Sequence, residues 1–122
     1  MFDVRKFWND ILKQDRDAIR RWFCPEAEIL WHCSGEQFNV EEFIAANCEY
    51  PGQWDGTVER IERLGDTIIT ATEVFTADKS LKFYAISFFE LKNGKIIRID
   101  EYWADQGEPP EWRQKMDIGK RI

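Results

Sequence analysis

The sequence is poor in basic residues, and this shortage limits its partners. Its 122 residues contain 17 Lys and Arg against 23 Asp and Glu, which gives a formal net charge of −6. Binding to nucleic acid or to an anionic membrane surface requires an excess of positive charge. We therefore expect neither nucleic acid nor a membrane as a partner of this protein.

Cysteine and special loop motifs are also scarce. The three cysteines, Cys24, Cys33 and Cys48, are odd in number and have no zinc-ligand spacing. No signal-peptide pattern, membrane-length apolar run, calcium loop, phosphate-binding glycine loop or nucleophile elbow is present. We expect reduced thiols, a cytoplasmic location, and neither a metal ion nor a cofactor.

Aromatic residues, in contrast, are abundant. Six Trp, nine Phe and three Tyr make up 15% of the chain. Such large side chains bury much area each, so they indicate a dense core, an aromatic-lined cavity or a partner surface. The length fits one domain over residues 1–122.

Hydrophobic periodicity predicts helices followed by hairpins. Asn39 and Glu42 have the spacing of a capping box at the start of one helix. The predicted helices span 4–12, 17–23 and 40–48, and the predicted strands span 28–33, 56–63, 67–76, 81–91 and 95–103. This order predicts an α+β fold with an antiparallel sheet.

The turn at Asn93-Gly94 allows a register to be predicted. A two-residue type I′ turn pairs Lys92 with Lys95, and regular pairing from there places Glu101 opposite Ile86. One face then reads as the buried one, and it contains Tyr84, Ile86, Phe88, Ile97, Ile99, Glu101 and Trp103. The opposite face, predicted to meet solvent or a second copy, contains Phe83, Ala85, Ser87, Phe89, Ile96, Arg98, Asp100 and Tyr102.

Two carboxylates fall on this predicted apolar face. Burial raises the pKa of a carboxyl group and suits it to proton transfer near neutral pH, so Glu101 is a candidate acid or base. The alternatives are a structural acid paired with Arg60, Arg98 or a backbone N–H, and a solvated residue at the end of a strand. A second turn at Asp78-Lys79 places Glu73 opposite Tyr84 on the same face, with the structural interpretation favoured for Glu73.

Four further residues have both a functional and a structural interpretation. His32, the only histidine, suits proton transfer, but the face of its strand is left open. Asn47 lies on an apolar helix stripe, where its amide binds either an internal partner or a ligand carbonyl. Trp54 and Trp112 either wall a pocket mouth or close the ends of the core.

With this order of elements, the sequence resembles the nuclear-transport-factor-two-like superfamily and, within it, the SnoaL-like polyketide-cyclase branch. The resemblance covers nearly the whole chain. It rests on Phe7-Trp8 in the first helix, the strand at 29–32, the helix at 40–48, Asn93-Gly94-Lys95-Ile96, and the segment Glu101-Tyr-Trp-Ala-Asp-Gln-Gly-Glu-Pro-Pro-Glu-Trp-Arg113.

The resemblance implies a cone, in which a strongly curved antiparallel or mixed sheet is wrapped by N-terminal helices and encloses a pocket. It implies cofactor-free chemistry by an inner-face carboxylate, His or Tyr, with Glu101 or Asp105 at the matching position of the last strand. It also implies a homodimer formed through the outer face of the sheet.

We therefore predict a metal-free SnoaL-like protein that acts on a small apolar or aromatic ligand. Glu101 and His32 are the predicted catalytic residues, and the predicted ligand-binding residues are Tyr84, Trp103, Asn47, Trp54 and Glu73. The alternative is a non-catalytic ligand-binding or dimerisation module.

Overall fold

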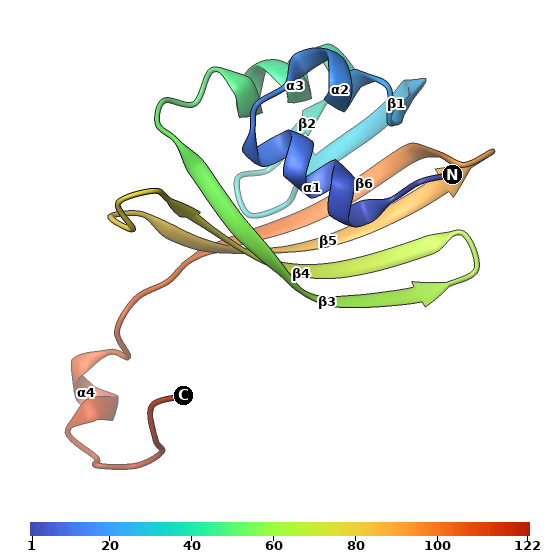
Figure 1. Cartoon of the computed structure of the whole chain (residues 1–122). Coiled ribbons are helices and arrows are strands. Elements are labelled where there is room, and N and C mark those ends of the chain that lie inside the picture. The colour runs from blue at the N-terminus through green and yellow to red at the C-terminus, as the bar shows by residue number, and fades with distance from the viewer.

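Three helices cover one face of a six-stranded sheet in the computed structural model, which describes residues 1–122 (Figure 1). The three covering helices are α1 (Val4–Leu12), α2 (Arg16–Arg20) and α3 (Val40–Cys48), and a fourth, α4 (Glu111–Gln114), stands apart near the C-terminus. The strands are β1 (Phe23–Trp31), β2 (Glu36–Phe38), β3 (Trp54–Leu64), β4 (Thr67–Thr76), β5 (Lys82–Lys92) and β6 (Lys95–Asp105). The α+β class with N-terminal helices is confirmed.

The strand order is β2-β1-β6-β5-β4-β3, with β1 parallel to β6 and all other neighbours antiparallel. The sheet is therefore mixed, and the parallel pair corrects the purely antiparallel interpretation of the sequence. A parallel pair needs a long crossover, which β2, α3 and the β3–β5 meander supply between β1 and β6.

Side-chain caps fix where the helices begin. The Asp3 carboxylate accepts hydrogen bonds from the N–H groups of Arg5 and Lys6, each at 3.1 Å, and starts α1. Asn39 and Glu42 form the predicted capping box of α3, at 2.8 and 2.9 Å. None of the helices is long and apolar enough to span a bilayer.

The second helix and the strand after it differ from the prediction. The helix α2 ends at Arg20, and β1 begins at Phe23 and runs through Pro25. The pairing of β1 with β6 shifts between Phe23 and Glu28, so Pro25, which has no N–H, lies where the ladder is irregular. The short elements β2 and α4 were not predicted, because three or four residues carry no periodicity.

A bulge in β6 changes which side chains face the core. Lys92 pairs with Lys95 as predicted, but the register shifts between Leu91 and Glu90 and leaves Ile97 without a partner. The positive φ angles of Asn93 (54°) and Gly94 (78°) fit the predicted type I′ turn. The bulge lets both Ile96 and Ile99 be fully buried on the inner face.

The core lies between this inner face and helices α1 to α3. Its contributors from the central strands are Ile68 and Val74 on β4, Ala85 and Phe89 on β5, and Ile96 and Ile99 on β6. Gly56 on β3 allows a close approach, since a Cβ atom there would lie 2.5 Å from the Glu73 carbonyl oxygen and 3.2 Å from Leu12 Cδ1. The absence of a side chain at Gly56 thus lets β3 and α1 close over the sheet.

Candidate functional site

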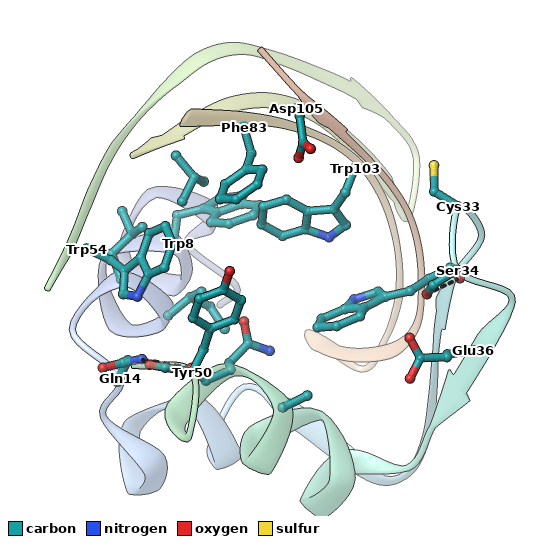
Figure 2. Close-up of a pocket in the computed structure, with 16 residues that line it drawn as sticks. Trp8, Gln14, Cys33, Ser34, Glu36, Tyr50, Trp54, Phe83, Trp103 and Asp105 are labelled. Carbon is teal, nitrogen blue, oxygen red and sulfur yellow. Dashed lines mark hydrogen bonds between the residues drawn. The ribbon is translucent and has the colours of Figure 1, made fainter. Parts of the chain in front are cut away.

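A pocket of about 400 Å³ opens between the inner face of the sheet and the helices (Figure 2). Eleven of its sixteen lining residues are hydrophobic. The lining comprises Trp8, Ile11, Leu12, Gln14, Trp31, Cys33, Ser34, Glu36, Ala46, Asn47, Tyr50, Trp54, Val74, Phe83, Trp103 and Asp105. This volume and apolar character are typical of small-molecule sites.

Aromatic rings form a continuous wall around the pocket. Tyr50 packs edge-on against Trp54 with ring centroids 5.0 Å apart, and Trp54 lies 5.9 Å from Phe83. Phe83 lies 6.2 Å from Trp103, which in turn lies 6.2 Å from Trp31. Since every ring is held by the next, the wall is a packed surface with few alternative rotamers.

A glutamine at the end of α1 places Tyr50 at the pocket. Gln14 adopts a positive φ of 55°, and its side-chain amide donates to the backbone oxygens of Asn47 and Tyr50, each at 2.8 Å. These two bonds join the end of α1 to the end of α3. The bond to Asn47 satisfies one of the carbonyl groups that the C-terminus of α3 leaves free.

The pocket contains two charged side chains, and both are carboxylates. Asp105 lies beside Phe83 and Trp103, whereas Glu36 lies on the other side of the pocket (Figure 2). Neither carboxylate forms an ion pair within the chain. Both therefore remain available to a ligand.

Glu101 is buried behind the aromatic wall. It is 1% exposed, and its two oxygens accept hydrogen bonds from Trp31 Nε1 at 2.9 Å and Ser87 Oγ at 2.6 Å. Burial raises the pKa of the Glu101 carboxyl, and the Ser87, Trp31 and Trp103 donors act in the opposite direction. The Trp103 indole N–H faces the Glu101 carboxylate and favours its charged form, although the geometry of this contact does not meet the criteria for a hydrogen bond.

Glu101 thus lies on the predicted inner face, but it does not line the pocket. Its predicted structural partners Arg60 and Arg98 were also wrong. The Trp31 indole N–H and the Ser87 hydroxyl donate to the Glu101 carboxylate instead. Access from the pocket is blocked, since Trp31 and Trp103, which do line it, present their indoles toward Glu101. The carboxylate of β6 that lines the pocket is Asp105.

Three predicted ligand-binding residues, Trp103, Trp54 and Asn47, line the pocket. The Asn47 side-chain amide donates to the Phe43 carbonyl oxygen at 2.9 Å, so its nitrogen has the internal partner that was one of the two interpretations. The indole nitrogens of Trp54 and Trp103 are buried and make no hydrogen bond within the chain, although the Trp103 N–H faces Glu101. Trp112 is 63% exposed and lies outside the pocket, contrary to both interpretations offered for it.

The predicted inner positions of Tyr84 and Glu73 are wrong. They pair with each other as predicted, but on the outer face, because the Ile97 bulge exchanges the two faces of β5 relative to β6. Ser87 and Ala85, and not Ile86 and Tyr84, therefore lie beside Glu101 and Trp103. The Glu73 carboxylate accepts a hydrogen bond from the Gln106 side chain at 2.8 Å.

His32 also lies outside the pocket. Its ring stacks on Tyr102 at 4.7 Å, and Nε2 lies 2.7 Å from the Asp100 carboxylate. Hydrogen bonds from Arg98, and then from His32, hold the pKa of Asp100 below its ordinary value. This cluster lies on the outer side of β6, so His32 cannot transfer a proton to a ligand in the pocket.

Several lining residues were not predicted, among them Trp8, Gln14, Trp31 and Tyr50. Trp8 and Trp31 carried only the signal of core residues in amphipathic elements. Gln14 and Tyr50 lie just beyond the ends of helices, where no periodicity indicates direction. Their positions depend on how α1 and α3 meet.

Solved structures show the same arrangement of elements. A protein of Kribbella flavida provisionally named a ketosteroid isomerase is 19% identical, with a TM-score of 0.80 over 98% of this chain and 86% of that one. An NTF2-like protein of unknown function from Burkholderia xenovorans is 25% identical, with a TM-score of 0.78 over 98% and 91% of the two chains. The chain has an NTF2-like fold.

The SnoaL-like branch receives weaker support. A protein of Shewanella putrefaciens provisionally named a SnoaL-like polyketide cyclase is 8% identical, with a TM-score of 0.69 over 93% of this chain and 80% of that one. An epoxide hydrolase of M. tuberculosis is another neighbour. No family model matches the sequence, and no curated protein matches it. NTF2-like proteins thus include isomerases, cyclases, epoxide hydrolases and proteins of unknown function.

Proposed function

We propose that this protein binds a small, largely apolar or aromatic organic molecule in the pocket of a cone-shaped NTF2-like domain. The observation that carries the proposal is the 400 Å³ pocket with its continuous aromatic wall. The unpaired indole N–H group of Trp54 supports it, because a buried donor normally has an acceptor. A ligand carbonyl or hydroxyl group would supply one.

Binding is tested with a neutral hydrophobic fluorophore, N-phenyl-1-naphthylamine. Its emission is expected to rise on addition of the protein. Ala46 lines the pocket on α3, so an A46W variant fills part of it and is expected to weaken binding about tenfold or more. The matched control is A77W, which adds the same side chain to the exposed β4–β5 turn. Equal binding by A46W and A77W would refute the proposal.

The second candidate is an enzyme that uses the same pocket for metal-free acid–base chemistry. It is favoured by the Asp105 carboxylate, which faces the aromatic wall without an ion-pair partner. In this proposal Asp105 replaces Glu101 as the group that exchanges a proton with the ligand, and Glu101 holds Trp31 in place. Isomerisation of a β,γ-unsaturated ketone and hydrolysis of an epoxide are the assays, and D105N is expected to lower either rate about 100-fold or more.

We also propose that two copies associate through the outer face of the sheet. No helix covers this face, and α4 stands apart from it (Figure 1). Its central strands carry a half-exposed apolar patch of Ile69, Tyr84, Ile86, Phe88 and Tyr102. Both charge signs flank the patch, Lys82 and Arg98 against Glu73 and Asp100, which suits a face that pairs with itself.

A further inference from the structure

The charges of the pocket restrict what the ligand can be. Glu36 and Asp105 are the charged residues of the lining, and neither is neutralised by a Lys, Arg or His of the chain. A carboxylate or phosphate ligand would face two like charges with no compensating donor cation. Both carboxylates are exposed at the rim, so solvent weakens their repulsion, but nothing in the lining attracts an anion.

The aromatic wall favours the opposite charge. Six rings line the pocket, from Trp8, Trp31, Tyr50, Trp54, Phe83 and Trp103. The negative face of an aromatic ring attracts a cation within about 6 Å of its centroid, and indole does so best. The two cation–π contacts within the chain, Lys79 on Phe75 and Arg113 on Trp112, involve rings outside the pocket. No cation of the chain therefore occupies the rings of the pocket.

We propose that the ligand carries a positive charge on an alkyl-substituted nitrogen, so that the aromatic wall surrounds the cation while Asp105 and Glu36 balance its charge. This inference rests on the proposed ligand-binding function and names the class of ligand. A metal ion does not fit this pocket. Metal ions require several oxygen, nitrogen or sulfur ligands at short distance. The structure contains no group of three or more Asp, Glu, His or Cys side chains that could hold one. A substituted ammonium ion needs only rings and a counter-charge.

The geometry in Figure 2 gives Asp105 the larger share of this recognition. Its carboxylate lies beside Phe83 and Trp103, where the aromatic wall is continuous. Glu36 belongs to the edge strand β2 and lies farther along the rim. Asp105 is exposed and its side chain makes no hydrogen bond, so its replacement is expected to leave the folded structure intact.

The test compares two ligands of the same shape, phenyltrimethylammonium and its neutral isostere tert-butylbenzene, by titration of tryptophan fluorescence. The cation is expected to bind about tenfold more tightly or better. D105N is expected to weaken cation binding about three- to tenfold and E36Q less so, while the neutral ligand changes by less than about twofold. D66N, which removes an equal charge from an exposed turn outside the pocket, is the matched control.

Two outcomes would overturn the inference and leave the proposed function standing. One is that the neutral isostere binds as tightly as the cation. The other is that the D105N/E36Q double variant retains the cation affinity of the parent protein while N-phenyl-1-naphthylamine still binds. If neither these ligands nor the naphthylamine binds, the proposed function fails and the inference fails with it.

Discussion

Glu101 shows how one buried residue can have a raised pKa without contacting a ligand. Its carboxyl is enclosed by side chains, and each oxygen already accepts one hydrogen bond. Because such a group costs free energy when it ionises, it usually marks either a site or a structural link. Its hydrogen bond to Trp31 makes Glu101 a support for the aromatic wall.

This burial has a consequence for stability. The folded pKa of Glu101 lies above the ordinary value of 4.5, so the folded state holds the proton more tightly than the unfolded state. Stability from this group is complete below about pH 4.5 and is lost as the pH rises through the folded pKa. The neutral E101Q variant should lack this decline, which is worth about 1.4 kcal/mol per pH unit within the window. Urea unfolding of the parent protein and of E101Q at pH 4.5 and pH 8 measures this decline. The assignment would be contradicted if the free energy of unfolding changed between the two pH values by the same amount in both proteins.

The outer location of His32 gives a second prediction for a single residue. H32Q retains a hydrogen-bond donor for Asp100 and is expected to change pocket binding by less than about twofold. Because the contact is partly exposed, the free energy of unfolding should fall by no more than about 1 kcal/mol. Titration with N-phenyl-1-naphthylamine and urea unfolding test both statements. Loss of binding in H32Q would restore His32 as a site residue.

At the scale of the element, two local irregularities place the site. The Ile97 bulge sets which residues of β5 accompany Glu101 and Trp103. The bare backbone at Gly56 lets α1 and β3 approach β4. Both features lie in strands that otherwise alternate regularly, and both determine the shape of the space between sheet and helices.

Gly56 allows a direct test of this closeness. In G56A the new Cβ atom would lie 2.5 Å from the Glu73 carbonyl oxygen, which is backbone and cannot move alone. The free energy of unfolding is expected to fall by about 1–3 kcal/mol, and pocket binding should weaken because Leu12 must shift. G107A is the control, since nothing lies within 4 Å of a Cβ atom there. Equal melting temperatures for G56A and G107A would show that the strand adjusts freely.

At the scale of the whole molecule, the two faces of the sheet have different tasks. The inner face builds the core and the pocket, whereas the outer face presents the apolar patch proposed to join two copies. The pocket lies within one chain, so ligand binding and association can be measured separately. Each can then fail without the other.

Association is tested by light scattering after size-exclusion chromatography. The parent protein should elute with twice the mass of one chain. I86E places a charge in the centre of the patch, where Ile86 is 37% exposed, and should yield the monomer because the buried charge has no partner. L64E, at a 78% exposed position at the end of β3, should leave the dimer intact. A monomeric parent protein would refute the proposed interface.

Local spacing in the sequence predicted most of the secondary structure and one face of β6. Periodicity located α1, α3 and strands β4 to β6, and the capping box and the Asn93-Gly94 turn specified where α3 and the last hairpin begin. The inner position of Glu101 and Trp103 also followed from alternation within β6. These features depend on neighbours close in sequence, so local spacing carries enough information.

The surroundings of these residues depend on how the strands and helices pack in three dimensions. A one-residue bulge reverses the facing of a partner strand, and no residue type near Ile97 signalled it, so Tyr84 and Glu73 were placed on the wrong face. The parallel pairing of β1 with β6 brings Trp31 to Glu101, although they are 70 residues apart. The packing of α1 and α3 then brings Tyr50 and Gln14 to the pocket. Such contacts depend on the summed geometry of the whole sheet, which no short stretch of sequence specifies.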